Sequence, residues 1–111
     1  SSGQAIFSLD IAMTGATVEE KLAAVRKVMI EKNAQYLPIT KLDQIAWLFN
    51  LRGHDVPYNP VFIAYALISL QDALLFTDKA KAPQNLPACI QLQPYEAFSN
   101  MLSFLGIHRA G

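Results

Sequence analysis

The sequence predicts a single α/β domain, in which a mixed β-sheet is flanked by helices. Its 111 residues are the length of one ordinary domain. Hydrophobic residues make up 52% of the chain and charged residues 16%, which is typical of a packed domain and unlike a disordered segment. Stretches with apolar residues at helical spacing alternate with short apolar runs that end at turn residues. This alternation favours helices packed on a sheet.

The chain is expected to divide into a short lead-in and one domain. Residues 1–16 are predicted to be an extended lead-in or interdomain linker, because apolar and polar positions mix there without a strong pattern and Gly15 interrupts them. Residues 17–111 are predicted to form the single domain.

The first helix of that domain is predicted to begin at Thr17. Glu20 stands three residues later, so the two side chains can satisfy each other's backbone amides in a capping box. Lys21 is expected to point away from the apolar face with the other charged residues, and Asn33 is expected to end the helix. The apolar face is predicted to consist of Leu22, Val25, Val28 and Met29.

A short strand and a short helix are predicted next. Residues 35–40 form the strand candidate, and Pro38 favours an edge position because proline has no amide donor. Thr40 and Asp43 repeat the capping pattern, which predicts a helix through about Leu48.

The second half of the chain is predicted to hold three strands and a last helix. Residues 61–69 are a continuous apolar run, typical of a strand covered on both faces. Residues 73–77 are predicted to return as the second strand of a hairpin, and residues 90–92 as a short strand. The last helix is predicted to begin near Pro94 and to end at Gly106. Its apolar stripe is predicted to consist of Tyr95, Phe98, Met101, Leu102 and Leu105.

Composition and motifs argue against several classes of function. The formal net charge is zero, which argues against electrostatic binding to nucleic acid or to a membrane surface. Cys89 is the only cysteine, which fits a reducing compartment, and its apolar neighbours predict a small buried side chain. The two histidines, His54 and His108, lie in different segments without metal-ligand spacing. We therefore expect no metal site and no catalytic residue in this chain.

The polar segment at residues 50–60 leaves two interpretations open. In the first, its polar residues are surface charges and turn formers, and its prolines only stiffen a connection. In the second, the segment is a rigid platform for recognition, on which Arg52 could hold a carboxylate through two parallel hydrogen bonds. Composition alone does not decide between them.

Three stretches of this chain resemble one enzyme family. The run LDQIAWLFNLRGHDVPYNPVFIAYAL at residues 42–67 resembles the middle domain of the three-domain Xaa-Pro aminopeptidases, a creatinase/prolidase N-terminal-like domain. GATVEEKLAAVR at residues 15–26 is similar to the opening helix of that domain, and PYEAF at residues 94–98 is similar to its closing segment. Two residues depart from the family pattern: His54 replaces a small or polar residue, and Pro38 replaces a branched aliphatic one.

The resemblance implies a fold and a context. The family domain has a mixed sheet with flanking helices in a ribonuclease-H-like topology. The enzymes that this chain resembles remove an N-terminal residue when proline comes second. They use two metal ions, typically Mn²⁺, in a C-terminal pita-bread domain, where the metals activate a bridging water. None of those metal ligands is in this sequence, so the chain resembles a non-catalytic part of a larger cytoplasmic enzyme.

The resemblance also implies a site and partners. Arg52, His54 and Tyr58 are expected to face the substrate cleft of the parent enzyme, with Asn59 as a weaker candidate. The expected partners are the catalytic domain and the first domain of the same chain, further subunits of a homo-oligomer, and a peptide with proline second. Three alternatives stay open: an assembly or oligomerisation module, a domain of a creatinase/prolidase-type hydrolase with another substrate, and a free-standing domain that binds a small ligand or a peptide.

Overall fold

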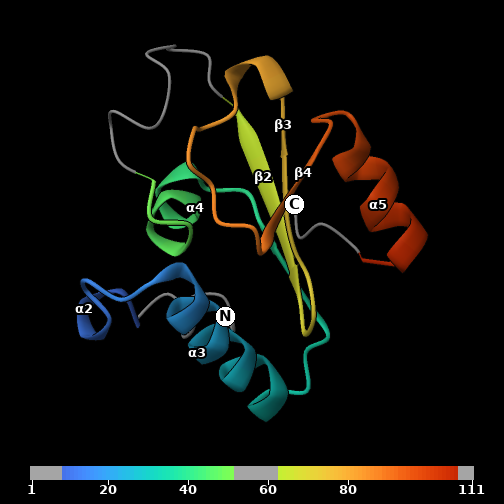
Figure 1. Cartoon of the computed structure of the whole chain (residues 1–111). Helices are drawn as coiled ribbons and strands as arrows, with labels where there is room; N and C mark the ends of the chain where they lie inside the picture. The colour runs from blue at the N-terminus through green and yellow to red at the C-terminus, as the bar shows by residue number, and fades with distance from the viewer. Residues whose placement is uncertain (1–8, 52–62, 108–111) are drawn as a thin grey trace.

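The computed structural model describes residues 9–51 and 63–107 (Figure 1). The first element among these residues is a helical turn, α2 (Leu9–Ala12), so the expected extended conformation is wrong at residues 9–12. The amide of Met13 donates to the Leu9 carbonyl at 3.0 Å, and the Leu9 side chain packs against the core. This contact gives a short helix an apolar surface to cover, which the weak sequence pattern did not reveal.

Four strands form one mixed sheet, which confirms the predicted α/β fold class. Their order is β1-β2-β3-β4; the first two pairings are antiparallel and the third is parallel. Pro38 lies in an outer strand of this sheet, as predicted. The strands are β1 (Tyr36–Ile39), β2 (Ala64–Ser69), β3 (Ala73–Thr77) and β4 (Ile90–Gln93).

Strand β2 is shorter than its apolar run. It begins at Ala64, whereas the run begins at residue 61, and residues 61–62 lie outside the described residues. Side chains along it alternate between two clusters: Ala66 and Ile68 pack in one, and Leu67 packs in the other. The prediction that this strand is covered on both faces is therefore confirmed.

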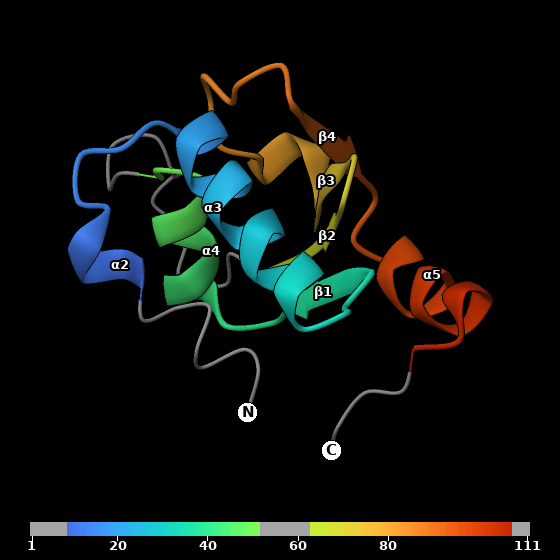
Figure 2. The same cartoon turned by 90° about the horizontal axis from the view of Figure 1, so that it is seen from below.

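Two helices cover one face of the sheet. Helix α3 (Val18–Glu31) and helix α4 (Leu42–Leu48) lie together on this side (Figures 1 and 2). Their buried apolar residues join inward-facing strand residues in the larger core cluster. Asn33 follows the end of α3 in the left-handed conformation (φ 57°), as predicted.

The predicted cap of α4 is wrong. The N-cap residue is Lys41, whose side chain makes no capping hydrogen bond. The helix begins one residue later than a Thr40 cap would require, so Asp43 occupies the second helical position, not the third that a capping box needs.

Among the described residues, one helix, α5 (Ala97–Leu105), covers the opposite face (Figure 2). Phe98 and Leu102 are buried in a second, smaller cluster with Leu67 and Phe76. The ring centroids of Phe98 and Phe76 lie 5.2 Å apart in an edge-to-face arrangement. Gly106 ends the helix in the left-handed conformation (φ 73°), as predicted.

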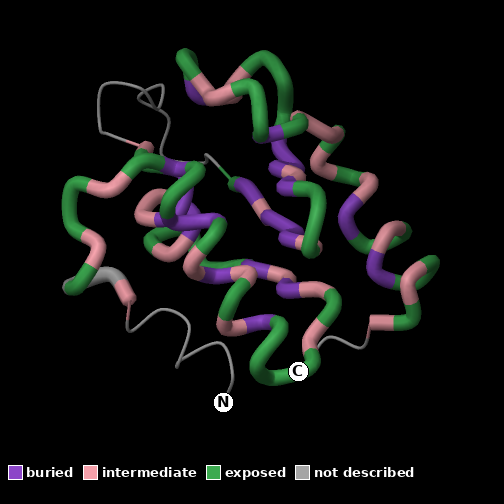
Figure 3. Tube along the Cα trace, turned by 60° about the horizontal axis from the view of Figure 1, so that its bottom comes forward, coloured by how far each residue is buried: buried purple, intermediate pink, exposed green. Residues whose placement is uncertain are grey.

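Burial follows this layered arrangement. The buried residues lie on the strands and on the inner sides of the helices (Figure 3). A 3₁₀ turn (Lys79–Lys81) in the connection from β3 to β4 has no buried residue. Within residues 9–51 and 63–107, no helix has the length and apolar content that crossing a bilayer requires.

Candidate functional site

The predicted site residues Arg52, His54, Tyr58 and Asn59 lie outside the described residues. The structure does describe the chain on both sides of the segment that carries them, at Leu51 and at Ile63. We call these two points the anchors of the segment, because the described chain stops at the first and resumes at the second.

The first anchor is the end of helix α4. Asn50 has φ 54° and takes the left-handed position that asparagine tolerates better than most residues. The Asn50 amide donates to the Trp47 carbonyl at 3.3 Å, and the Leu51 amide donates to the Ala46 carbonyl at 2.9 Å. This pair of hydrogen bonds is a Schellman motif, which fixes the direction in which the chain leaves the helix.

A buried lysine holds this anchor from the neighbouring helix. Lys21 of α3 donates from Nζ to the Trp47 carbonyl at 2.7 Å and to Oδ1 of Asn50. Its Nζ also lies 4.8 Å from the centroid of the Trp47 ring, within cation–π range. The Trp47 carbonyl is at the negative end of the α4 dipole, which favours a cation there. Three groups of one helix end therefore converge on a single ammonium.

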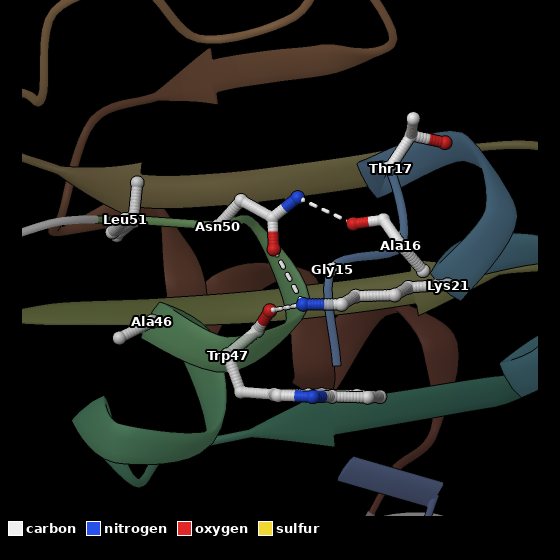
Figure 4. A pocket seen from close by; sticks show the side chains of 8 residues that line it. All are labelled: Gly15, Ala16, Thr17, Lys21, Ala46, Trp47, Asn50 and Leu51. Atoms are coloured by element: carbon white, nitrogen blue, oxygen red, sulfur yellow. Dashed lines mark hydrogen bonds between the residues drawn. The ribbon is translucent and has the colours of Figure 1, made fainter. Parts of the chain in front are cut away.

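Asn50 extends the contact to the segment before α3. Its Nδ2 donates to the Ala16 carbonyl at 2.9 Å, so one amide side chain accepts from Lys21 and donates to the backbone (Figure 4). We call the set Ala16, Lys21, Trp47 and Asn50 the Lys21 latch. The latch joins the start of α3 to the end of α4 through side-chain hydrogen bonds.

The burial of Lys21 corrects the sequence prediction. Only 4% of the residue is exposed, although it was expected to point away from the apolar face. Desolvation lowers the pKa of Lys21 below its usual value. Helical spacing contained the signal, because Lys21 is three residues after Val18 and four before Val25, both of which are buried.

A pocket of about 350 Å³ lies beside the latch. Thr17 lines this pocket at the start of α3. The predicted capping box is confirmed there: the Glu20 amide donates to Oγ1 of Thr17 at 3.1 Å, and the Thr17 amide donates to Oε1 of Glu20 at 2.8 Å. These hydrogen bonds lower the pKa of Glu20. The pocket is lined by Gly15, Ala16, Thr17, Lys21, Ala46, Trp47, Asn50 and Leu51 (Figure 4).

The second anchor is the residue before β2. The hydroxyl of Thr77, a residue only 1% exposed at the end of β3, donates to the Ile63 carbonyl at 2.9 Å. Ala64 pairs with Thr77 in the β2–β3 register, so the strand pairing and this side chain hold the same point. Both ends of the polar segment thus attach to well-packed elements.

The described residues contain no group of three or more histidine, cysteine or acidic side chains that could hold a metal ion.

Cys89, predicted to be buried, is exposed, because it lies in the turn that precedes β4. Its thiol donates to Oε1 of Glu19 at 3.7 Å. Partial desolvation and the Glu19 carboxylate raise the pKa of Cys89, which keeps the thiol protonated.

The described residues form a four-stranded α/β module with one anchor on each side of residues 52–62. The chain belongs to the creatinase/prolidase N-terminal domain family, whose sequence model matches residues 1–107. This match covers almost the whole chain and confirms the creatinase/prolidase N-terminal domain that the sequence motifs indicated.

Relatives of this chain include longer proteins named probable Xaa-Pro aminopeptidase P. One from Laccaria bicolor is 40% identical over 104 residues, which cover 90% of this chain and 16% of the relative. One from Coccidioides posadasii is 42% identical over 99 residues, 86% of this chain and 16% of the relative. The chain therefore spans about a sixth of the length of these relatives.

A solved structure gives the same relationship in three dimensions. It is an X-prolyl aminopeptidase from Caenorhabditis elegans, described as a cytosolic enzyme with a di-nuclear active site. The TM-score is 0.68 at 27% identity, and the match covers 88% of this chain and 17% of that one. The dinuclear site is a property of that enzyme, and the described residues of this chain offer no metal-binding group to match it.

Proposed function

We propose that this chain is the non-catalytic middle domain of a three-domain Xaa-Pro aminopeptidase and helps to shape its substrate cleft. The observation that carries the proposal is the 40% identity, over 90% of this chain, to a probable Xaa-Pro aminopeptidase P. The parent enzyme would remove the first residue of a peptide that has proline second. Its location would be cytoplasmic, like that of the cytosolic Caenorhabditis elegans enzyme.

The anchors support a role in shaping the cleft. A segment held at the Lys21 latch and at Ile63 has defined end points, and binding residues are often on loops that a rigid scaffold positions. On that segment we assign cleft-facing roles to Arg52, His54 and Tyr58, with Asn59 as the weaker candidate. Arg52 suits a substrate carboxylate or carbonyl, because its guanidinium offers several donors in a fixed geometry.

The catalytic metals would come from elsewhere in the parent enzyme. Two Mn²⁺ or similar ions would be held by the pita-bread domain, and the described residues of this chain supply no cluster that fits them. We expect this chain to contact that domain and the first domain, within a homo-oligomer. No step of the chemistry is assigned to a residue of this chain.

The test is Arg52→Ala in the full-length enzyme that carries this domain. The loss of charge-assisted hydrogen bonds costs roughly 1.5–3 kcal/mol, so kcat/KM on an Xaa-Pro peptide should fall by about ten- to a hundredfold. Arg52→Lys should recover only part of the loss, because lysine lacks the fork of donors. Lys79→Ala, at an exposed position outside the site, is the matched control. Unchanged kcat and KM for Arg52→Ala would refute the cleft role.

The same enzyme tests two of the alternatives. If the parent is a creatinase/prolidase-type hydrolase with another substrate, peptides with proline second should be no better than peptides without it. If this domain serves only assembly, its deletion should change the oligomeric mass while Arg52→Ala leaves the kinetic constants unchanged.

A further inference from the structure

The outer side of helix α5 carries an exposed aromatic side chain. Phe104 is 83% exposed, more than any other large hydrophobic residue that the structure describes. The next in this set is Ile30, on α3, at 65%. Single exposed apolar residues are common, so Phe104 gains meaning only from what lies beside it.

An apolar groove adjoins Phe104 along the same helix. Met101 precedes Phe104 by three residues, and such pairs are neighbours on a helix surface. Met101 and Leu105 form one wall of a groove of about 210 Å³, whose remaining lining residues are Tyr36, Leu67, Ser69, Asp72 and Leu74. A dry cavity of about 150 Å³ can take a benzene ring, so this groove can hold an aromatic or branched side chain. We call Phe104, Met101, Leu105 and the apolar residues of the groove the α5 patch.

The α5 patch has the composition of an interface centre. Tyr36, Leu67 and Leu74 form its floor on three neighbouring strands, and its polar edge is Ser69 and Asp72 at the β2–β3 turn. An apolar centre with a polar rim is the arrangement found in protein interfaces. It lies on the sheet face that one nine-residue helix covers, opposite α3 and α4 (Figures 1 and 2).

We propose that the α5 patch receives an apolar side chain from another domain of the same polypeptide. This inference rests on the proposed function and names the surface through which the domain is held. The relatives are about six times as long as this chain, so in them the domain has neighbours on its own polypeptide. The occupant is an aliphatic or aromatic residue of such a neighbour, inserted beside Phe104.

The size of the patch favours a tethered partner over a free one. A stable complex between separate proteins uses about 20–30 residues on each side, whereas the patch has six apolar residues. A partner on the same chain is present at an effective concentration of about millimolar or more, so a smaller contact is sufficient. For the same reason, a second copy of this chain is a poor occupant.

Photo-cross-linking in the full-length enzyme tests the proposal. With p-benzoylphenylalanine in place of Phe104, we expect a cross-link within one polypeptide to a residue outside this domain. The same probe at Ile30 is the matched control, exposed on α3, and should give no such cross-link. A cross-link from position 104 to this domain alone, or to a second polypeptide, would overturn the proposal.

Hydrogen exchange supplies a second measurement that does not depend on cross-linking chemistry. In the full-length enzyme, Phe104→Ser should lower the protection of α5 amides about tenfold, because it removes the burial of one large apolar side chain. Ile30→Ser should leave α5 unchanged; equal effects of the two variants would overturn the proposal. In the isolated chain, sedimentation should show a monomer, and a dimer that Phe104→Ser abolishes would assign the patch to a second copy.

The outcome is separable from that of the proposed function. A full-length enzyme that cleaves Xaa-Pro peptides but gives no cross-link beyond this domain refutes the docking surface alone. One that gives the cross-link but shows no preference for proline refutes the assigned activity alone.

Discussion

The two faces of the sheet are completed in different ways. On one face, α3 and α4 bury most of the core, and the Lys21 latch joins them through hydrogen bonds to neutral oxygen atoms. On the other, α5 is the one described helix that covers the smaller aromatic cluster, and the α5 patch lies beside it. The first face has the features of a self-sufficient core, and the second has those of a surface built to be covered. One face of a sheet can thus be fully covered by the domain's own helices, while the other face is left for neighbouring domains to cover.

The largest expected effect comes from removing the aromatic contact that holds α5. Phe98→Ala should cost about 3–5 kcal/mol of unfolding free energy, a large fraction of a typical domain's stability. Because α5 has no other helix beside it among the described residues, we also expect α5 to separate from the sheet in the folded state of this variant. Unfolding would then expose less additional surface, so the urea m value should be smaller. Urea unfolding followed by far-UV circular dichroism measures both. Leu22→Ala, in the core on the other face, should lower stability without changing m; equal m values for both variants would contradict the difference between the faces.

A smaller loss is expected from the latch. Lys21→Ala should cost about 2–4 kcal/mol, because the Trp47 carbonyl and the Asn50 amide lose a charged donor and the packed lysine stem is removed. Lys21→Met keeps most of the stem, so the difference between the two variants separates packing from hydrogen bonding. Chemical denaturation of both variants gives the values. If Lys21→Met were as stable as the parent chain, the hydrogen bonds of the latch would have no net value.

The smallest effect is expected at Phe104. In the isolated chain, Phe104→Ser should change the unfolding free energy by no more than about 0.5 kcal/mol, because the ring is exposed there. The same denaturation experiment measures it, with Ile30→Ser as the reference for an exposed apolar residue. A loss above about 1 kcal/mol would mean that Phe104 supports this domain directly, contrary to the distinction between the two faces.

The local pattern predicted elements well where one signal dominated. The capping box at Thr17, the stop at Asn33 and the burial of Phe98 and Leu102 depend on neighbouring residues in the sequence, and all three are confirmed. The predicted start of the last helix near Pro94 is wrong, because α5 begins at Ala97 and Tyr95 precedes it. Thr40 does not cap α4, because the helix begins one residue later than the sequence pattern predicted and Lys41 occupies the N-cap position.

The latch could be predicted only in part. Lys21 has the spacing of a core residue, but a charge is favourable there only because Trp47 and Asn50, from a distant part of the chain, surround it. Such a tertiary contact leaves no local signal. Arg52, His54, Tyr58 and Asn59 were chosen from the family resemblance, and their roles remain predictions.

Trp47 is the only tryptophan in the chain, and it lies in the latch. Its intrinsic fluorescence therefore reports on one place, the junction between α3 and α4, while circular dichroism reports on all helices and strands together. A spectroscopist can follow the two faces separately in one sample: emission at the latch should stay constant while the α5 side loosens. The chain contains its own optical probe, close to the point at which residues 52–62 begin.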